Sequence, residues 1–205
     1  MTKYDVIVIG SGPGGYVAAI RCAQLGMKTA IVEKNPTLGG TCLNVGCIPS
    51  KALLDSSEHV SKANKEFAEH GIGVGQVTVD FGQMIKRKNE VVKANVDGID
   101  FLMKKNNIVV LRGTGSFVDK NTIKVTHNKK STQYGVERVI IATGSEPANL
   151  PFIQLDGKQI ITSTEALSLP AIPKSMAIIG GGIIGVEMGS VYSRLGTDVT
   201  VYEYA

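Results

Sequence analysis

Short apolar runs and longer amphipathic stretches alternate along this chain of 205 residues. Residues 4–9 (YDVIVI) and 28–34 (KTAIVEK) are nearly continuous apolar runs of strand length. Runs of this kind, bounded by glycine, predict strands buried on both faces of a parallel sheet. Between them, residues 10–26 predict a glycine turn followed by an amphipathic helix that ends at Gly26. The pattern therefore predicts a strand–turn–helix–strand unit.

The same pattern recurs near the end of the sequence. Residues 174–203 read as a strand, a glycine turn, a helix that ends at Gly196, and a second strand. The first unit carries Gly10-x-Gly12-x-x-Gly15 and then Glu33, and the second carries Gly180-x-Gly182-x-x-Gly185 and then Glu203. The acidic residue follows the first glycine by 23 positions in both, from 10 to 33 and from 180 to 203. The chain thus contains one pattern twice.

Each position of this pattern has a physical role in binding a dinucleotide. Gly10 allows the tight turn, Gly12 lets the backbone approach a pyrophosphate, and Gly15 lets helix and strand pack closely. The helix N-terminus faces the phosphates, and Glu33 can accept hydrogen bonds from a ribose. One unit alone would also fit a glycine turn with a surface glutamate. Two equally spaced units imply two dinucleotides, or one unit that has lost its ligand. A carboxylate would repel a 2′-phosphate, so Glu203 favours NAD over NADP.

The segment between the two units predicts a helix and a small antiparallel excursion. Residues 80–106 have apolar positions at helical spacing, which predicts a long amphipathic helix; these positions are Met84, Ile85, Val91, Val92, Val96, Ile99 and Met103. Residues 108–141 read as short strands with turns, of which the last runs into Thr143 and Gly144. Prolines cluster after it, which places a domain boundary between residues 148 and 149. The predicted fold is α/β, with Rossmann-like domains at 1–148 and 149–205 and the second one incomplete.

Composition and charge exclude several other classes. The net charge is +4, from 22 basic and 18 acidic residues, without a basic block or an aromatic–basic stripe, so nucleic acid is not an expected partner. The apolar runs are shorter than the ~20 residues that span a membrane. The N-terminus enters the first strand without a signal or transit peptide. We expect a soluble cytoplasmic protein, or a mitochondrial matrix protein if the chain is processed.

Two of the three cysteines, Cys42 and Cys47, lie in the glycine-rich stretch GGTCLNVGCIPSK (39–51). We expect a loop there, up to a helix that starts near Cys47. They could form a metal site, a structural disulfide or a working dithiol. A zinc site needs four ligands at short spacings, and the remaining candidates are Cys22, inside the first predicted helix, and three scattered histidines, His59, His70 and His127. No metal site is therefore expected. A reducing compartment disfavours a structural disulfide, which leaves a redox dithiol.

A dithiol in a chain with two dinucleotide units requires a relay. A helix is predicted to start near Cys47 (CIPSKALLDSSEHV, 47–60), and its N-terminus beside the sulfur would favour the thiolate. A dithiol exchanges electrons through attack of a thiolate on a disulfide, whereas a nicotinamide exchanges a hydride. A flavin can connect the two. We therefore expect FAD at the first unit and NAD at the second, with Cys42 and Cys47 against the flavin as one redox centre.

Three motifs, GGTCLNVGCIPSK, ATGSEP and GGGIIGVEMG, together resemble the class I pyridine-nucleotide disulfide oxidoreductases. The resemblance runs over the whole chain and is closest to the flavoproteins that oxidise dihydrolipoyl groups in 2-oxo-acid dehydrogenase and glycine-cleavage complexes. It implies a lipoyl domain as partner and a homodimer in the full-length protein. Mercuric reductases also resemble the cysteine motif and are the nearest alternative within the family.

The resemblance implies a role for each matching position. Cys42 is similar to the interchange thiol and Cys47 to the charge-transfer thiol that faces the flavin. Lys51 would lie near the flavin ring with Glu187 as its partner, although by itself it also fits an exposed lysine in a first helical turn. The implied FAD-binding residues are Gly10, Gly12, Gly15, Glu33, Lys34, Gly39, Gly40, Thr41, Cys42, Lys51, Gly115, Thr143, Gly144 and Ser145. The implied NAD-binding residues are Gly180, Gly181, Gly182, Ile183, Ile184, Gly185, Glu187 and Glu203.

The chain departs from the family pattern in its length. Family members are more than twice as long, and their C-terminal dimerisation domain supplies a catalytic histidine–glutamate pair that none of the histidines here matches. We expect an N-terminal portion of a larger enzyme, which would not turn over efficiently by itself. A non-catalytic FAD-binding fragment is the alternative.

Overall fold

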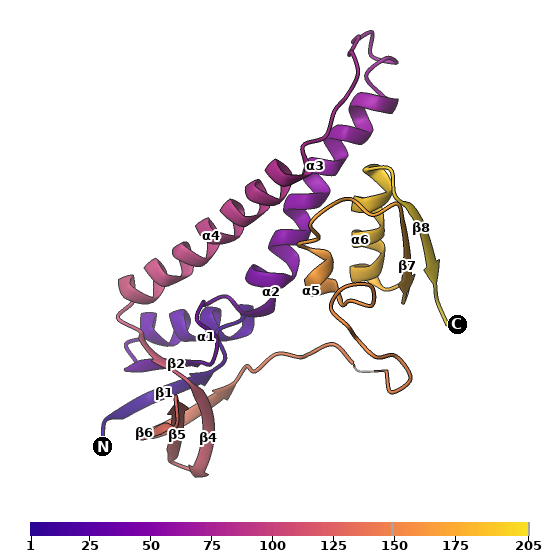
Figure 1. Cartoon of the computed structure of the whole chain (residues 1–205). Coiled ribbons are helices and arrows are strands. Elements are labelled where there is room, and N and C mark those ends of the chain that lie inside the picture. Colours follow the sequence, from indigo (N-terminus) through magenta and orange to yellow (C-terminus); the bar gives the residue numbers. More distant parts are fainter. Residues whose placement is uncertain (149, 205) are drawn as a thin grey trace. The chain divides into compact units, whose positions relative to one another are not determined.

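The computed structural model describes residues 1–148 and 150–204, and Figure 1 shows its helices and strands. The chain forms two compact units, residues 1–44 with 93–146, and residues 45–92 with 147–205. Each unit is built from segments that are distant in sequence, and helix α4 (Phe81–Lys105) contributes to both. The predicted α/β fold class is confirmed. The predicted domain boundary stays a prediction, and Asn149 beside it lies outside the described residues.

The first unit contains a six-stranded sheet in the order β3-β2-β1-β6-β5-β4. The strands β1, β2, β3 and β6 are parallel, whereas β4 and β5 form an antiparallel meander with β6, as the predicted excursion requires. Strand β6 belongs to both parts, because residues 130–135 pair with β5 and residues 135–141 pair with β1. The strand bounds are β1 (Lys3–Ile9), β2 (Thr29–Glu33), β3 (Val109–Arg112), β4 (Thr114–Asp119), β5 (Thr122–His127) and β6 (Lys130–Ile141).

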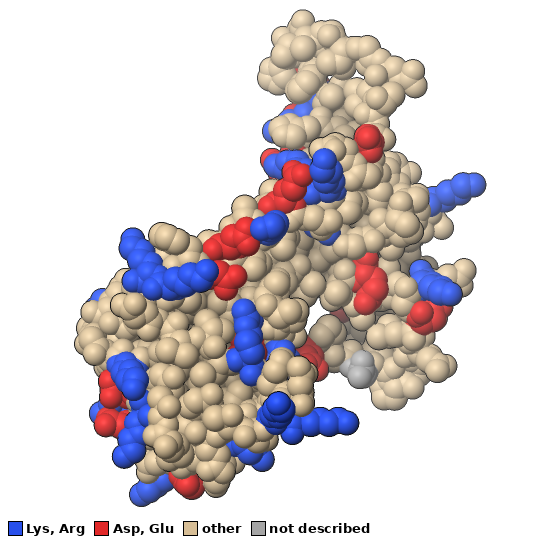
Figure 2. Space-filling view, turned by 60° about the vertical axis from the view of Figure 1, so that its left-hand side comes forward, with Lys and Arg blue, Asp and Glu red and all other residues tan. Residues whose placement is uncertain are grey.

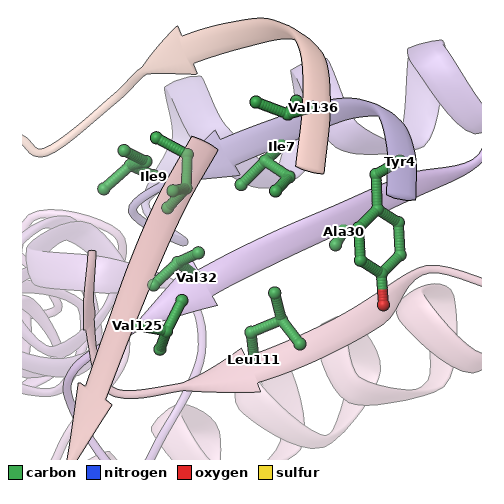
Figure 3. Packing of buried hydrophobic residues seen from close by; sticks show 9 residues of the cluster. Tyr4, Ile7, Ile9, Ala30, Val32, Leu111, Val125 and Val136 are labelled. Carbon is green, nitrogen blue, oxygen red and sulfur yellow. The ribbon is translucent and has the colours of Figure 1, made fainter. Parts of the chain in front are cut away.

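Apolar side chains cover both faces of the parallel strands. On one face, Ile7 and Ile9 of β1 and Val32 of β2 pack with Val125 of β5 in a buried cluster (Figure 3). The meander therefore folds over this face of the sheet. Strand alternation puts Val6 and Val8 on the opposite face, where helix α1 (Pro13–Gln24) packs on β1 and β2. Burial on both faces explains why β1 reads as a continuous apolar run.

Helix α1 begins and ends where its sequence predicts. Gly12 is its N-cap, and Pro13 occupies the first turn, where its missing N–H costs nothing. At the other end Gly26 adopts a φ of +83°, and the N–H of Met27 donates to Cys22 O at 3.2 Å. Glycine tolerates this left-handed conformation, which satisfies the last carbonyls of the helix. The predicted turn–helix segment is thus confirmed.

The second unit repeats the strand–helix–strand arrangement. Strands β7 (Ser175–Ile179) and β8 (Asp198–Tyr202) are parallel and are joined by helix α6 (Ile183–Arg194). Helices α3 (Cys47–Lys65) and α5 (Ser163–Ala166) pack against α6. Their contact is apolar and consists of Leu53, Ala166, Leu167, Met188 and Val191.

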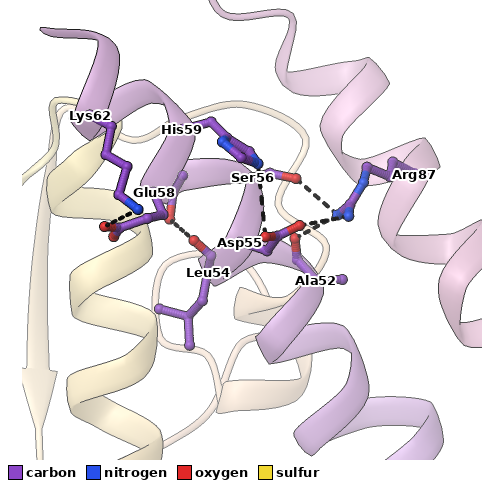
Figure 4. Close-up of polar contacts among 9 residues, drawn as sticks. Ala52, Leu54, Asp55, Ser56, Glu58, His59, Lys62 and Arg87 are labelled. Carbon is purple, nitrogen blue, oxygen red and sulfur yellow. Dashed lines mark hydrogen bonds and ion pairs between the residues drawn. The ribbon is translucent and has the colours of Figure 1, made fainter. Parts of the chain in front are cut away.

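Two consecutive residues of α4 tie neighbouring segments of the second unit together. The Arg87 guanidinium donates to Ala52 O (3.0 Å), Ser56 Oγ (3.1 Å) and Asp55 Oδ2 (2.7 Å) on α3 (Figure 4). The next residue, Lys88, is buried, and its ammonium donates to Leu167 O at 3.0 Å and to the adjacent Ser168 Oγ at 2.8 Å. Because burial disfavours the charged form, the pKa of Lys88 is lowered. These bonds fix the start of α4 and the end of α5.

Tyr192 of α6 is fully buried, and its hydroxyl donates to Ala166 O on α5. Burial raises the pKa of Tyr192 to about 12. We expect Tyr192→Phe to lower the free energy of unfolding by about 1–2 kcal/mol at pH 7, because the buried carbonyl loses its donor. The folded-state pKa lies above the unfolded value of about 10. The stabilisation by the Tyr192 hydrogen bond is therefore complete below pH ~10 and is lost as the pH rises through the folded-state pKa.

Urea denaturation of both proteins between pH 7 and pH 12 measures this difference. The difference between the urea concentrations at which half of the wild type and half of Tyr192→Phe are unfolded should decrease above pH ~10, where the tyrosine ionises in the unfolded chain. Tyr202→Phe is the matched control, because Tyr202 is 60% exposed on β8. A difference that stayed constant to pH 12 would contradict the assignment.

Charged side chains of both signs are interspersed on the face shown in Figure 2. The structure also has exposed ion pairs between close neighbours in sequence, such as Lys93–Asp97 at 2.5 Å and Arg138–Glu137 at 3.2 Å. Exposed pairs of this kind stabilise a fold by well under about 1 kcal/mol each. Among the described residues, every helix is too short or too polar to cross a membrane.

Candidate functional site

The first glycine turn leaves no room for a side chain at Gly10 or at Gly15. Gly10 has a φ of +102°, and its N–H donates to Val32 O at 2.8 Å. A Cβ at Gly10 would lie 2.2 Å from Ala142 O, and one at Gly15 would lie 1.8 Å from Gly10 O. Both contacts are with backbone, which cannot move aside as a flexible side chain can. The turn therefore requires glycine at both positions, and α1 packs tightly onto the end of β1.

This turn lies at the switch point of the sheet. Strand β1 has β2 on one side and β6 on the other, and the chain fills the β2–β3 side first and returns to the other side of β1 with β6. Ligands of open α/β sheets bind in the crevice at the carboxyl ends of such strands. There the structure brings together Gly10 and Thr143, because a Cβ on Gly10 would lie 3.2 Å from Thr143 Cα. Gly144 and Ser145 follow and are exposed.

Gly115 of β4 lies at the same end of the sheet, on the face that the meander covers and opposite to helix α1. A Cβ at this position would lie 3.3 Å from Ile9 Cγ2 and 3.4 Å from Val32 Cγ1, at the ends of β1 and β2. Its missing side chain lets the meander approach these strands closely. Gly115 therefore packs against the apolar layer beneath the turn.

Glu33, the last residue of β2, is held in a defined position. The residue is only 5% exposed. Its Oε2 accepts from Ser11 N at 3.0 Å and from Ser11 Oγ at 2.5 Å, and its Oε1 accepts from Asn35 N at 2.8 Å. The adjacent Lys34 is exposed and pairs with Glu146 at 3.4 Å. The sequence analysis did not identify Ser11 and Asn35 as partners of Glu33. The sequence feature that could have indicated them is their position, next to Gly10 and two residues after Glu33.

The cysteine stretch is helical on both sides of Gly46. The helix predicted from near Cys47 is confirmed, whereas the loop predicted before it is wrong. Helix α2 (Gly40–Val45) contains Thr41 and Cys42, and helix α3 begins at Cys47 after the single residue Gly46. The Asn44 side-chain amide donates to Leu38 O (3.0 Å) and Gly40 O (2.8 Å), which satisfies carbonyls at the start of α2. Glycine content suggested a loop, but the glycines lie at the helix boundaries.

Two of these glycines bring α2 against the first turn. Gly39 and Gly40 have φ values of +97° and +59°. A Cβ on Gly40 would lie 2.6 Å from Gly12 Cα, and Gly39 N donates to Ser11 O at 3.0 Å. The backbone that carries Cys42 thus lies directly against the dinucleotide turn. Cys42 is half-buried there.

In the second unit, Cys47 is exposed at the first residue of α3. One turn later Lys51 forms an ion pair with Glu187 of α6. This pair joins the third motif to the cysteine motif, as the resemblance implied. Within the described residues, no group of three or more His, Cys, Asp and Glu side chains is arranged to hold a metal ion.

The second glycine turn has the geometry of the first. Gly180 has a φ of +106°, and its N–H donates to Tyr202 O at 2.8 Å. Gly182 is the N-cap of α6, and a Cβ on Gly185 would lie 2.3 Å from Gly180 O. The N–H of Gly181 donates to the Glu203 carboxylate, as Ser11 N does to Glu33. The two turns therefore share the backbone hydrogen bonds as well as the glycine spacing.

An open cavity of about 1620 Å³ adjoins this second turn. Its lining includes Gly180, Gly182 and residues 183–185, with residues 158–163 on the connecting segment. It exceeds the roughly 300–1,000 Å³ of ordinary small-molecule pockets, so its volume does not exclude a dinucleotide. Gly181, Glu187 and Glu203 are outside its lining.

Comparison with known proteins agrees with this geometry. The model of the family described as pyridine nucleotide-disulphide oxidoreductase matches residues 4–205. This chain belongs to that family. The family that was inferred from three short motifs is thus confirmed over residues 4–205.

Individual members of this oxidoreductase family resemble the chain over nearly its whole length. It is 52% identical over 204 residues to mitochondrial dihydrolipoyl dehydrogenase of Schizosaccharomyces pombe, covering 98% of this chain and 40% of that protein. It is 50% identical to dihydrolipoyl dehydrogenase of Trypanosoma brucei brucei, covering 98% and 43%. Among solved structures, the HOCl-induced flavoprotein disulfide reductase RclA of Escherichia coli matches with a TM-score of 0.80 and 30% identity over 97% of this chain and 41% of that chain. The chain thus spans about two fifths of the curated relatives it matches.

Proposed function

We propose that the protein containing this chain oxidises protein-bound dihydrolipoyl groups to lipoyl groups and reduces NAD⁺ to NADH. The observation that carries the proposal is the repeated glycine turn with its carboxylate, found twice in a chain that also contains the Cys42–Cys47 motif. Two dinucleotide sites and a dithiol suit a transfer of two electrons between thiols and a nicotinamide. The relatives named dihydrolipoyl dehydrogenase support the substrate class.

The first unit has the features that an FAD molecule requires. The turn at Gly10 and Gly12 keeps the backbone open to a pyrophosphate, and Glu33 ends the neighbouring strand with a fixed carboxylate for the ribose. We assign the flavin contacts to the residues near these groups and to the cysteine helices: Lys34, Gly39, Gly40, Thr41, Lys51, Gly115, Thr143, Gly144 and Ser145. When bound, FAD supplies two-electron transfer between the dithiol and NAD⁺.

The second unit has the features that NAD⁺ requires. Gly180 to Gly185 repeat the glycine turn, and Glu203 repeats the ribose carboxylate. The carboxylate disfavours a nucleotide with a 2′-phosphate. Ile183 is 82% exposed at the first residue of α6, and it provides an apolar surface beside the turn.

The cysteines perform the thiol chemistry as a disulfide that opens and closes. A dihydrolipoyl thiolate attacks Cys42 Sγ, the Cys42–Cys47 bond breaks, and the electron pair leaves on Cys47 Sγ as a thiolate. The second lipoyl thiol loses its proton and displaces Cys42, which closes the lipoyl disulfide. The overall reaction is dihydrolipoyl + NAD⁺ → lipoyl + NADH + H⁺. A general base must accept the thiol proton, and the family resemblance assigns it to the dimerisation domain.

The same proposal covers partner and assembly. A lipoyl domain of a 2-oxo-acid dehydrogenase or glycine-cleavage complex would present the dithiol, and the full-length protein would be a homodimer. Relatives named as mitochondrial support the matrix as one location, and the cytoplasm stays the prediction for an unprocessed protein.

An anaerobic visible spectrum of the full-length protein, taken before and after one equivalent of dihydrolipoamide, tests this function. We expect a flavin spectrum that gains a long-wavelength band from a thiolate beside the flavin. A bound flavin that does not respond to the dithiol would support a non-catalytic flavin-binding role instead. A protein that binds no FAD when it is supplied would contradict the assignment of the first turn.

A further inference from the structure

Ser11 connects three parts of the first unit although it lies between two motif glycines. The residue is 0% exposed. Its N–H and hydroxyl both donate to Glu33 Oε2, and its carbonyl accepts from Gly39 N at 3.0 Å. It therefore joins the end of β1 to the carboxylate that ends β2 and to the start of the helix that carries Cys42.

These bonds determine which carboxylate oxygen of Glu33 stays available. An ionised carboxylate has about four acceptor directions, two on each oxygen. Ser11 takes both directions of Oε2, and Asn35 N takes one direction of Oε1 at 2.8 Å. One acceptor direction is left, and it is on Oε1. A ribose hydroxyl that donates to Glu33 would therefore bind at Oε1.

We propose that Ser11 is a positioning residue for cofactor binding, which orients the Glu33 carboxylate so that Oε1 accepts from the adenosine ribose. The inference rests on the proposed binding of FAD to the first turn. Ser11 contributes without contacting the ribose, because its hydroxyl is directed at Glu33. A carboxylate that is held before binding loses less conformational entropy when the ligand arrives.

The second turn has the equivalent carboxylate, Glu203, but no serine hydroxyl to bind it. Gly181 occupies the position of Ser11 and donates only its N–H to Glu203. Glu203 is exposed there, whereas Glu33 is buried. The additional bond therefore belongs specifically to the first turn, where we propose that a flavin is held throughout the reaction.

The test is a double-mutant cycle on the full-length apoprotein, with FAD affinity measured by calorimetry for the wild type, Ser11→Ala, Glu33→Gln and the double variant. Loss of a hydrogen bond to a charged group should weaken FAD binding about tenfold in Ser11→Ala. In the Glu33→Gln background the same change should weaken binding less than about twofold, because the carboxylate it orients is absent. Ser131→Ala is the matched control, since Ser131 is an exposed serine whose hydroxyl forms a hydrogen bond with Thr126 Oγ1 at 2.9 Å, outside the glycine turn.

A second readout uses FAD analogues that lack one ribose hydroxyl. The affinity lost with the 2′-deoxy or the 3′-deoxy adenosine analogue should be smaller in Ser11→Ala than in the wild type. An equal loss in both proteins, or an equal effect of Ser11→Ala in both backgrounds of the cycle, would show that Ser11 acts only on the fold and would overturn the inference. Wild-type protein that binds no FAD would instead overturn the proposed function.

Discussion

Replacing Cys47 with serine is expected to abolish the reduction of NAD⁺ by dihydrolipoamide in the full-length protein and to remove the long-wavelength absorption band. A serine hydroxyl forms neither a disulfide with Cys42 nor a stable anion near neutral pH, so the electron pair has no sulfur on which to leave. Cys47 is exposed at the first residue of α3, where it can be reached. Turnover should fall to background, while the flavin itself stays bound.

Two further serine variants make this expectation specific. Cys42→Ser should also abolish turnover, but it should keep the band without added dithiol, because the sulfur of Cys47 is still present to face the flavin. Cys22→Ser should retain activity and spectrum, since Cys22 is a half-buried residue of α1 outside the proposed redox pair. A Cys47→Ser protein that still developed the band would disprove the assignment of Cys47 as the thiol that faces the flavin.

Gly15→Ala is expected to destabilise the protein by about 3 kcal/mol or more and to prevent FAD binding. A Cβ at this position would lie 1.8 Å from Gly10 O and 2.8 Å from Gly10 C. Both atoms are backbone atoms of the turn that holds β1, so α1 must move away from the sheet. The displaced helix would no longer direct its N-terminus at the phosphates.

Gly14→Ala is the matched control, because it makes the same chemical change one residue earlier in the helix. Its Cβ would meet only Ala142 Cβ at 4.0 Å, an ordinary contact. Alanine should even favour the helix slightly, by up to about 1 kcal/mol. Urea denaturation and FAD titration of both variants measure the difference. Equal stability of the two variants would show that the turn is not as tightly packed as the structure indicates.

The elements that the sequence predicted well are those whose signal is local. Helix α1 has its proline in the first turn and its glycine after the last, and β1 is apolar because it is buried on both faces. The long helix predicted at 80–106 is α4 (Phe81–Lys105), with Val96, Ile99 and Met103 buried along one side. Periodicity suffices for such elements, because burial imposes it directly.

The cysteine stretch shows where local signals failed. Its glycines suggested a loop before Cys47, yet residues 40–45 are helical. The φ values of Gly39 and Gly40 and the contact of Gly40 with Gly12 depend on a turn almost thirty residues earlier. A contact between distant segments decides this conformation, and glycine content alone cannot distinguish a helix boundary from a loop.

The sequence by itself determined the two glycine turns, the spacing of Glu33 and Glu203, the α/β class and the family, because these depend on residue identity and short-range geometry. Only the tertiary structure decided that Ser11 orients Glu33. It also decided that Lys88 is buried against Leu167. Both arrangements need partners distant in sequence, and a polar side chain that is buried must find its hydrogen bonds wherever the fold provides them.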